Sequence, residues 1–304
     1  MKKYFCAIVF LFFFYLSPFS SQAQLLFRIS GNGLEKPSYI VGTYHLAPAS
    51  FADSIPGLRE AFAATEQVYG EVDMVETLKP ENAEKLQKAM TLPEGTTLSS
   101  LLTKEQMERL NALLRELMGV DMNNEEVAAQ LDKLAPMVLE TQLTLLIYMK
   151  NIQGLNPADL IDTYFQREAL KIGKAIRGFE TVDFQMKILY GAPIEKQVED
   201  LMCFVDNYGE SVEMAEFITA AYFAQDMEML EELNLEEQEG ACAGTPEDND
   251  KLIYDRNANW VKEMPSIMSE KPTFFAVGAF HLCGNRGVLR MLEAKGYKIE
   301  PIRK

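Results

Sequence analysis

The chain contains two histidines, and both stand in the same local pattern near opposite ends of the sequence. Ile40-Val-Gly-Thr-Tyr-His45-Leu46 and Ala276-Val-Gly-Ala-Phe-His281-Leu282 share the frame apolar–Val–Gly–x–aromatic–His–Leu. Glycine has no Cβ, so another backbone or a ligand can approach Gly42 or Gly278 closely. Because imidazole is a common metal ligand, the repeated motif predicts one functional site shared by both histidines.

Two glutamates stand in similar settings and complete the predicted site. Glu71 directly follows Gly70, and Glu180 comes two residues after Gly178. Two imidazoles with one or two carboxylates form a first shell for a divalent transition metal such as Mn, Co, Zn or Fe. The remaining carboxylate would then activate water as a general base for hydrolysis.

We assign His45, His281 and Glu180 to the metal and Glu71 to catalysis, although the two glutamates could exchange these roles. The alternative for each glutamate is a buried ion pair, with Arg177 or Arg256 as its partner. Asp73, one strand period beyond Glu71, is a weaker candidate on the same face.

Other catalytic motifs are missing from the sequence. It contains no HExxH, no P-loop and no G-x-S-x-G elbow. Gly31-Asn-Gly33 lacks the rest of a dinucleotide fingerprint and reads as a turn. Cys283, two residues after His281, could be a nucleophile, but a packed thiol is the favoured interpretation.

The predicted site residues follow short apolar runs that are typical of strands. Four such runs cover residues 38–44, 67–73, 174–180 and 273–280, and edge strands are expected at 25–31 and 297–302. Ligand clefts of α/β proteins lie beyond the ends of the strands, where these histidines and glutamates stand.

Between the strands, the pattern favours helices. Thr103-Lys-Glu-Gln106 is a capping box that begins one helix, and Gly119 ends it. Pro136 suits the first turn of a second helix, and residues 211–233 are predicted to form one long helix. We therefore expect an α/β fold in which helical layers surround a central mixed β-sheet. Residues 24–304 would form a single domain with helical insertions at about 80–160 and 190–265.

The first 23 residues have the pattern of a secretory signal peptide. Lys2 and Lys3 precede an apolar stretch at 6–16, and Ser21-Gln-Ala23 places small residues at a cleavage site. Export to the periplasm or the medium is expected, with no stable membrane anchor after cleavage. The alternative is an uncleaved anchor, for which the apolar stretch is short.

The charge is strongly acidic, at −16 for the whole chain. Loss of residues 1–23 would remove two lysines and no acid, so the net charge of −16 would become −18. Such a surface repels nucleic acid and anionic lipid, and a nucleic-acid partner is not expected. Of the three cysteines outside this segment, Cys203 and Cys242 could pair in an oxidising compartment, which the sequence leaves open.

Two segments resemble the signatures of the TraB/PrgY/GumN family. They run from Arg28-Ile-Ser-Gly-Asn-Gly to His45-Leu46 and from Gly278-Ala-Phe-His-Leu-Cys to Gly296-Tyr297. Between them, Glu71, Arg177-Gly-Phe-Glu180-Thr, Gln185 and Arg256-Asn257 fall where that family places similar elements. The resemblance spans the chain beyond residue 23.

The resemblance implies a class of reaction but names no substrate. The family includes the Tiki proteins, which are divalent-metal-dependent proteases, and its wider relatives include erythromycin-esterase-like hydrolases and haem-binding ChaN-like proteins. The implied site is His45, His281 and Glu71, with Glu180 and a catalytic Arg256 nearby and Asn257 in support. Phe280 and Cys283 depart from the family pattern, and a thiolate at 283 would favour softer ions.

The sequence as a whole predicts an exported metal-dependent hydrolase, acting as a peptidase on a peptide or protein substrate. Three alternatives use the same histidines. The protein could bind haem or metal without turnover, or it could be a metal-free, esterase-like enzyme with a histidine base. In the third alternative, both histidines are structural.

Overall fold

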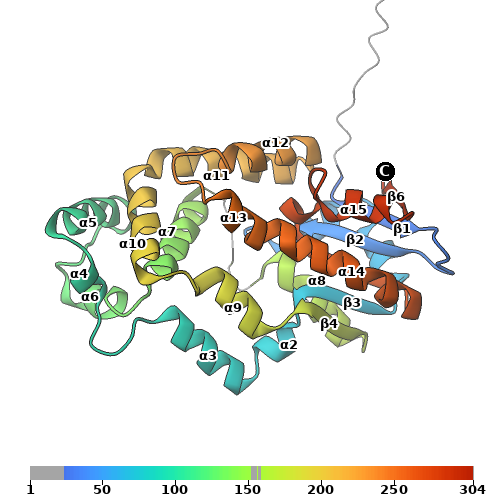
Figure 1. Ribbon diagram of the computed structural model, residues 1–304, viewed down its shortest axis with the longest axis horizontal. Coiled ribbons are helices and arrows are strands. Elements are labelled where there is room, and N and C mark those ends of the chain that lie inside the picture. Colours follow the sequence, from blue (N-terminus) through green and yellow to red (C-terminus); the bar gives the residue numbers. More distant parts are fainter. Residues whose placement is uncertain (1–23, 152–155, 157–158, 304) are drawn as a thin grey trace, which may run out of the picture.

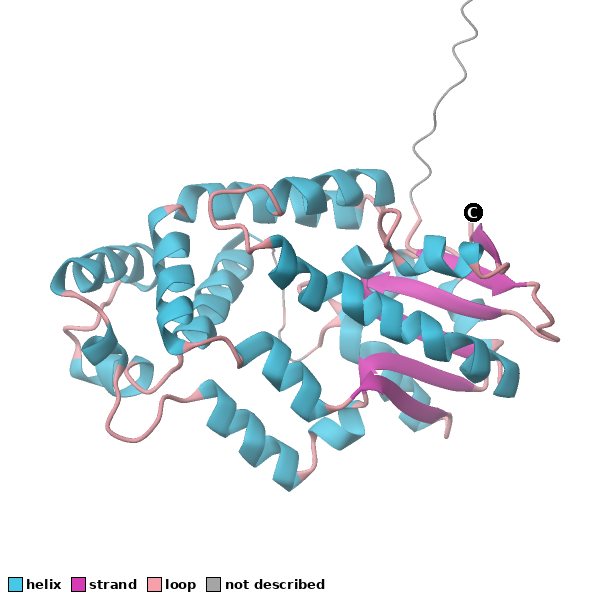
Figure 2. Ribbon diagram, in the orientation of Figure 1, coloured by secondary structure: helices cyan, strands magenta, loops and turns pink. Residues whose placement is uncertain are grey.

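Six strands form one mixed sheet in the computed structural model, which describes residues 24–151, 156 and 159–303 (Figures 1 and 2). They are β1 (Leu26–Ser30), β2 (Ser38–Thr43), β3 (Gln67–Val72), β4 (Ala175–Glu180), β5 (Thr273–Gly278) and β6 (Lys298–Pro301). The predicted α/β class with a central mixed sheet is confirmed. Each strand lies in one of the six predicted ranges, with ends that differ by at most two residues.

The strand order is β4-β3-β5-β2-β1-β6. The four strands that lead to the predicted site residues, β4, β3, β5 and β2, therefore lie side by side, and they are parallel. The register pairs Thr43 with Gly278 and Val72 with Glu180, so the carboxyl ends of β2, β3, β4 and β5 meet at one edge. β1 joins β2 antiparallel, through a turn in which Gly31, Asn32 and Gly33 all have positive φ, as the sequence predicted.

Helices cover both faces of the sheet, because its central strands alternate apolar side chains between the faces. Phe274 packs with Phe165 of α8 (Ile161–Lys171) in one core, which also includes residues of α1 (Leu58–Ala63). Phe275 packs with Trp260 of α14 (Asp255–Glu270) in a second core, together with α15 (Val288–Ala294). Burying one such aromatic side chain contributes roughly 1.5–3 kcal/mol.

The remaining helices lie mostly beyond the carboxyl edge of the sheet (Figure 1). They are α2 (Met74–Thr77), α3 (Pro80–Met90), α4 (Leu98–Leu101), α5 (Lys104–Met118), α6 (Glu125–Leu131), α7 (Pro136–Asn151), α9 (Val182–Tyr190), α10 (Ile194–Asp206), α11 (Tyr208–Phe223), α12 (Met227–Glu237) and α13 (Pro246–Asn249). Three short segments adjoin them: the 3₁₀ helices η1 (Ala49–Ser54) and η3 (Ala279–Leu282), and the π-helical turn η2 (Asp250–Tyr254).

The helices farthest from the sheet share a third core. Leu114 of α5, Leu143 of α7 and Leu201 of α10 are buried together there. α5 begins at the predicted capping box, in which Thr103 and Gln106 exchange side-chain and backbone hydrogen bonds, and it ends at Gly119 with φ of 76°.

The prediction of one helix over residues 211–233 is wrong. α11 ends at Phe223 and α12 begins at Met227. Gln225 adopts a left-handed conformation with φ of 58°, and the Asp226 side chain accepts a hydrogen bond from the Met229 amide as an N-cap. The chain therefore turns between two helices whose apolar patterns run on without a sequence break.

Cys203 of α10 and Cys242, in the loop after α12, form a disulfide, which settles the pairing that the sequence left open. Cys283 is a free, buried thiol, and burial raises its pKa to about 12. It is therefore protonated at neutral pH, as expected of a packed thiol rather than a nucleophile.

Within the described ranges, none of the helices combines the length and the apolar composition that a membrane span requires. The predicted signal peptide, residues 1–23, lies outside the described residues.

We expect loss of the disulfide to destabilise the protein by about 2–4 kcal/mol, because it closes a 39-residue loop and restricts the unfolded chain. Denaturant unfolding of Cys203→Ala/Cys242→Ala under non-reducing conditions measures this change. Dithiothreitol should lower the stability of the wild type to the level of the double variant and leave the double variant unchanged. Equal stability of both proteins without reductant would contradict the prediction.

Candidate functional site

The predicted site residues meet at the carboxyl edge of the parallel strands. His45 follows β2, Glu71 lies near the end of β3, and Glu180 ends β4. His281 lies in η3, three residues after the last residue of β5, and Arg256 is in the first turn of α14. Residues up to 236 positions apart in the sequence are thus brought to one place, where α/β proteins bind their ligands.

A cavity of about 370 Å³, which we call the site cavity, opens at this edge. Five of the predicted residues line it: His45, Glu71, Arg256, Gly278 and His281. Most of its other lining is apolar and comes from Tyr44, Ile188, Leu189, Ile218, Tyr222, Leu230, Leu252, Ile253, Ala279 and Phe280. Glu180, Asn257 and Gly42 support the site from outside this lining.

Arg256 is buried, with 6% of its side chain exposed, and it connects the other charged groups. Its Nε and Nη2 donate to the two oxygens of Glu180 at 2.7 and 2.9 Å, and Nη2 also donates to Glu71 at 2.6 Å. Its Nη1 donates to the Leu252 carbonyl at 3.0 Å and to His281 Nε2 at 3.1 Å. Since these bonds engage all its N–H groups, the geometry makes Arg256 a positioning residue.

Glu180 is a buried ion-pair partner, one of the two alternatives that the sequence left open. Its side chain is 5% exposed, and beyond the two bonds from Arg256 it accepts one from Trp260 Nε1 at 2.9 Å. Phe179 stacks on Trp260 beside it. The carboxylate therefore faces Arg256 and Trp260 rather than the site cavity.

Glu71 is an anchored anion at the edge of the site cavity. Its Oε1 accepts from the Gly278 amide at 2.9 Å, and its Oε2 accepts from Arg256 and from Gln185 at 3.2 Å. Burial by itself would raise the pKa of Glu71, but the charges of His281, Arg256 and His45 and the Gly278 hydrogen bond lower it to about 2. Such a weak base is poorly suited to accepting a proton near neutral pH and well suited to binding a cation.

His281 is a neutral base with a defined tautomer. Its Nδ1 is 2.7 Å from Asn257 Oδ1, which can only accept, so Nδ1 carries the hydrogen and Nε2 presents a lone pair. Burial, together with Arg256, lowers the pKa of His281 to about 4. Asn257 in turn donates to the Arg286 carbonyl at 3.0 Å, which holds the amide in this orientation.

His45 has a partner that the sequence analysis missed. Its Nδ1 lies 3.1 Å from Oδ2 of Asp162, in the first turn of α8, and the Thr43 hydroxyl donates to the other oxygen of Asp162. The Asp162 charge and hydrogen bond raise the pKa of His45 to about 9. An acidic residue in a first helical turn has an ordinary structural explanation, so no sequence signal singled Asp162 out.

The motif glycines permit close backbone packing at the strand ends. A Cβ on Gly42 would lie 3.1 Å from the Ala279 backbone, so β2 and η3 touch at this point. A Cβ on Gly178 would lie 2.4 Å from the Asp73 amide. Both glycines therefore bring neighbouring chain segments together, and for Gly42 this is the close backbone approach that the histidine motif suggested.

The donor types at this edge suit a divalent transition metal. Asp162 and Asn257 hold the Nδ1 atoms of the two imidazoles, as outer partners of metal-bound histidines commonly do. His281 Nε2 and Glu71 Oε1 are 3.9 Å apart. Two ligand atoms of a tetrahedral site are roughly 3.4 Å apart when each bond is about 2.1 Å.

The ligand set is nevertheless incomplete as it stands. Across residues 24–151, 156 and 159–303, no three His, Cys, Asp or Glu side chains are grouped as they would be around an ion. In addition, His281 Nε2 accepts the hydrogen bond from Arg256, which a metal bond at this atom would replace. The residue types therefore suit a divalent metal, but the hydrogen bond from Arg256 engages one of the donor atoms, His281 Nε2.

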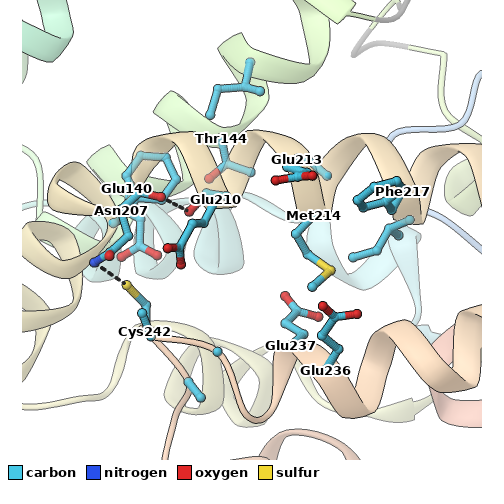
Figure 3. Close-up of a pocket in the computed structure, with 18 of the residues that line it drawn as sticks. Glu140, Thr144, Asn207, Glu210, Glu213, Met214, Phe217, Glu236, Glu237 and Cys242 are labelled. Carbon is cyan, nitrogen blue, oxygen red and sulfur yellow. Dashed lines mark hydrogen bonds between the residues drawn. The ribbon is translucent and has the colours of Figure 1, made fainter.

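Figure 3 shows a second cavity of about 490 Å³, which we call the acidic cavity. It is lined by Glu140, Glu210, Glu213, Glu236 and Glu237, and no described residue of its lining is Lys, Arg or His. Burial raises the pKa of Glu140 to about 7 and also raises that of Glu237. Ile218 lines both cavities. An acidic ligand approaching from this side would meet like charge.

We expect the two histidines of the metal-free protein to titrate far apart. His281 should gain its proton only near pH 4, because it is buried beside Arg256, whereas His45 should keep its proton until about pH 9, because it is paired with Asp162. Nitrogen-15 NMR of the two imidazoles measures both values directly. In Asp162→Asn the pKa of His45 should fall toward its ordinary value of 6.5, and two overlapping titrations in the wild type would contradict the assignment.

The two shifts also act on stability in opposite pH windows. For His281 the unfolded chain takes up a proton near pH 6.5, above the folded value, so stability is lost as the pH falls from about 6.5 through 4. For His45 the folded value is the higher one, so its contribution is present below pH 6.5 and is lost as the pH rises through 9.

Glu180→Gln should lower the free energy of unfolding by about 3 kcal/mol, since it leaves the buried Arg256 without its bidentate carboxylate partner. Denaturant unfolding tests this change. The matched variant Asp183→Asn, at an exposed carboxylate three residues further on, should stay within about 0.5 kcal/mol of the wild type. Similar stabilities for both variants would contradict the role assigned to Glu180.

Comparisons with known proteins agree with the sequence signatures. The sequence model of the TraB/PrgY/gumN family matches residues 25–301. The protein named Metalloprotease TIKI homolog from Nematostella vectensis is 23% identical over 88% of this chain and 65% of its own length. For Metalloprotease TIKI2 from Danio rerio the values are 25%, 87% and 58%, and for Metalloprotease TIKI1 from Homo sapiens they are 23%, 88% and 60%.

The chain therefore spans less than two thirds of the length of these relatives. No solved structure matches it. The family match begins at β1, ends in β6 and includes every strand and both histidine motifs. The chain belongs to the TraB/PrgY/gumN family.

Proposed function

We propose that this protein is an exported metal-dependent hydrolase that cleaves peptide bonds, with His45, His281 and Glu71 holding a divalent ion. The observation that carries the proposal is the meeting of two oriented imidazoles and one anchored carboxylate in a cavity that is otherwise mostly apolar. The metalloprotease names of the relatives support the reaction class. Export rests on the N-terminal segment, residues 1–23.

In this proposal the two glutamates exchange the roles first assigned to them. Glu71 lines the site cavity and stays anionic to about pH 2, which suits a metal ligand. Glu180 is engaged by Arg256 and Trp260, which suits a positioning role.

The chemistry that a divalent ion supplies when bound is Lewis acidity, which polarises a peptide carbonyl and lowers the pKa of water. The residues of the chain prepare its surroundings. Asp162 and Asn257 hold the Nδ1 hydrogens and so leave the Nε2 lone pairs of His45 and His281 for the ion. Arg256 holds Glu71 in place.

A metal-free hydrolase is the second candidate, and the pair formed by His45 and Asp162 favours it. A carboxylate that orients an imidazole through Nδ1 is the arrangement of a histidine base. With a pKa of about 9, however, His45 is protonated near neutral pH in the absence of a metal, so it would work as a base only at alkaline pH.

We expect the protein, purified without a polyhistidine tag, to bind near one equivalent of Mn, Co, Zn or Fe. His45→Ala and His281→Ala should each lose this metal, because each removes one of its nitrogen ligands, and should lose peptide hydrolysis by at least about 100-fold. Metal content is measured by mass spectrometry, and hydrolysis is measured before and after chelation and re-addition of the ion.

Asp73→Asn is the matched control, because Asp73 lies beside the site but serves as the N-cap of α2, a role that asparagine also fills. It should keep both metal and activity. Metal retained in both histidine variants would remove the metal assignment. Hydrolysis that chelation leaves unchanged, with an optimum above pH 9, would favour the metal-free candidate instead.

A further inference from the structure

The groups of the proposed site lie between two cavities rather than at the end of one. Thr43, His45, Glu71 and Gln185 line the site cavity, and the same four residues line an adjoining cavity of about 300 Å³. The adjoining cavity lies along β3 and α2 and reaches α8. A bound chain molecule can therefore continue in both directions from His45 and Glu71.

The site cavity itself has one dominant chemical character. Its walls are built by pairs of branched apolar residues, Ile188 and Leu189 from α9 and Leu252 and Ile253 from η2, with Phe280 from η3. Leu189 is 46% exposed and Leu252 is 39% exposed, although both sit at the border of the candidate site. When a ligand covers apolar groups that are exposed around a concave site, the removal of their surface from water favours binding.

The acidic cavity, which shares the lining residue Ile218 with the site cavity, disfavours an acidic occupant that approaches from that side. Within the site cavity, the negative charge of Glu71 lies beside the positive charges of Arg256 and His45. The volume of about 370 Å³ is near the lower end of the range of ligand pockets, and it has room for one large side chain with the adjacent backbone.

We infer that the site cavity takes the apolar side chain of a residue next to the bond that is cut, within a peptide that continues into the adjoining cavity. The substrate class is thus an internal peptide bond flanked by Leu, Ile, Met or Phe. Hydrolysis adds one water across this amide bond and releases a carboxylate and an amine. The inference rests on the proposed hydrolase activity for the reaction and on the cavity walls for the selectivity.

The test uses peptides blocked at both ends that differ only at one position, given to the metal-loaded protein. Cleavage beside Leu, Ile, Met or Phe should have kcat/KM roughly tenfold or more above cleavage beside Asn or Asp. Leu189→Asn and Leu252→Asn keep the number of side-chain heavy atoms and replace the two methyl groups with a polar amide, so each should reduce this preference about fivefold. Leu170→Asn, at a 52% exposed leucine on α8 outside both cavities, should leave it unchanged.

A binding experiment separates this inference from the hydrolase proposal. Calorimetry with the same blocked peptides in the presence of EDTA should show tighter binding of the Leu peptide than of the Asn peptide, and Leu252→Asn should abolish the difference. If this selectivity is found without any hydrolysis under metal, the cavity assignment stands and the hydrolase proposal fails. If blocked peptides are cut without regard to the apolar residue, or only unblocked peptides are cut, the inference is overturned while the hydrolase proposal stands. Absence of both selective binding and hydrolysis overturns both.

Discussion

The site depends on one buried cation, Arg256. A guanidinium with 6% of its side chain exposed is stable only if nearby acceptors replace the water it has lost, and here Glu71, Glu180, His281 and a backbone carbonyl do so. These partners come from β3, β4, η3 and η2, while Arg256 belongs to α14. One side chain therefore ties the ends of two strands to the helix that covers one face of the sheet.

The same cation sets different protonation states on neighbouring groups. Together with His281 and His45 it lowers the pKa of Glu71, and together with burial it lowers that of His281. His45, on the other side of Glu71, is protonated because Asp162 faces it. An anion, a neutral imidazole and an imidazolium thus lie in one cavity, and each state follows from a particular partner rather than from the type of residue.

The sheet and the helices contribute different properties to the site. The two histidines, Glu71 and Glu180 stand on strand ends or on short segments attached to them, where the parallel register holds them in place. The apolar walls come mainly from helical segments between β4 and β5, namely α9, α11, α12 and η2. In this arrangement the sheet positions the chemistry, and the helical segments decide what can approach it.

The sequence by itself determined the α/β class and the six strand positions, because backbone periodicity and residue type are local properties. It also singled out the two histidine motifs and Glu71 as one candidate site, whereas Arg256 joined them only through the family resemblance. Only the tertiary structure decided which side chains face one another. Arg256 lies 76 residues from Glu180 and 185 from Glu71, and Asp162 lies 119 residues from Thr43. It also decided the disulfide and the break between α11 and α12. Partners so distant along the chain are chosen by the packing of whole elements, which no local pattern records.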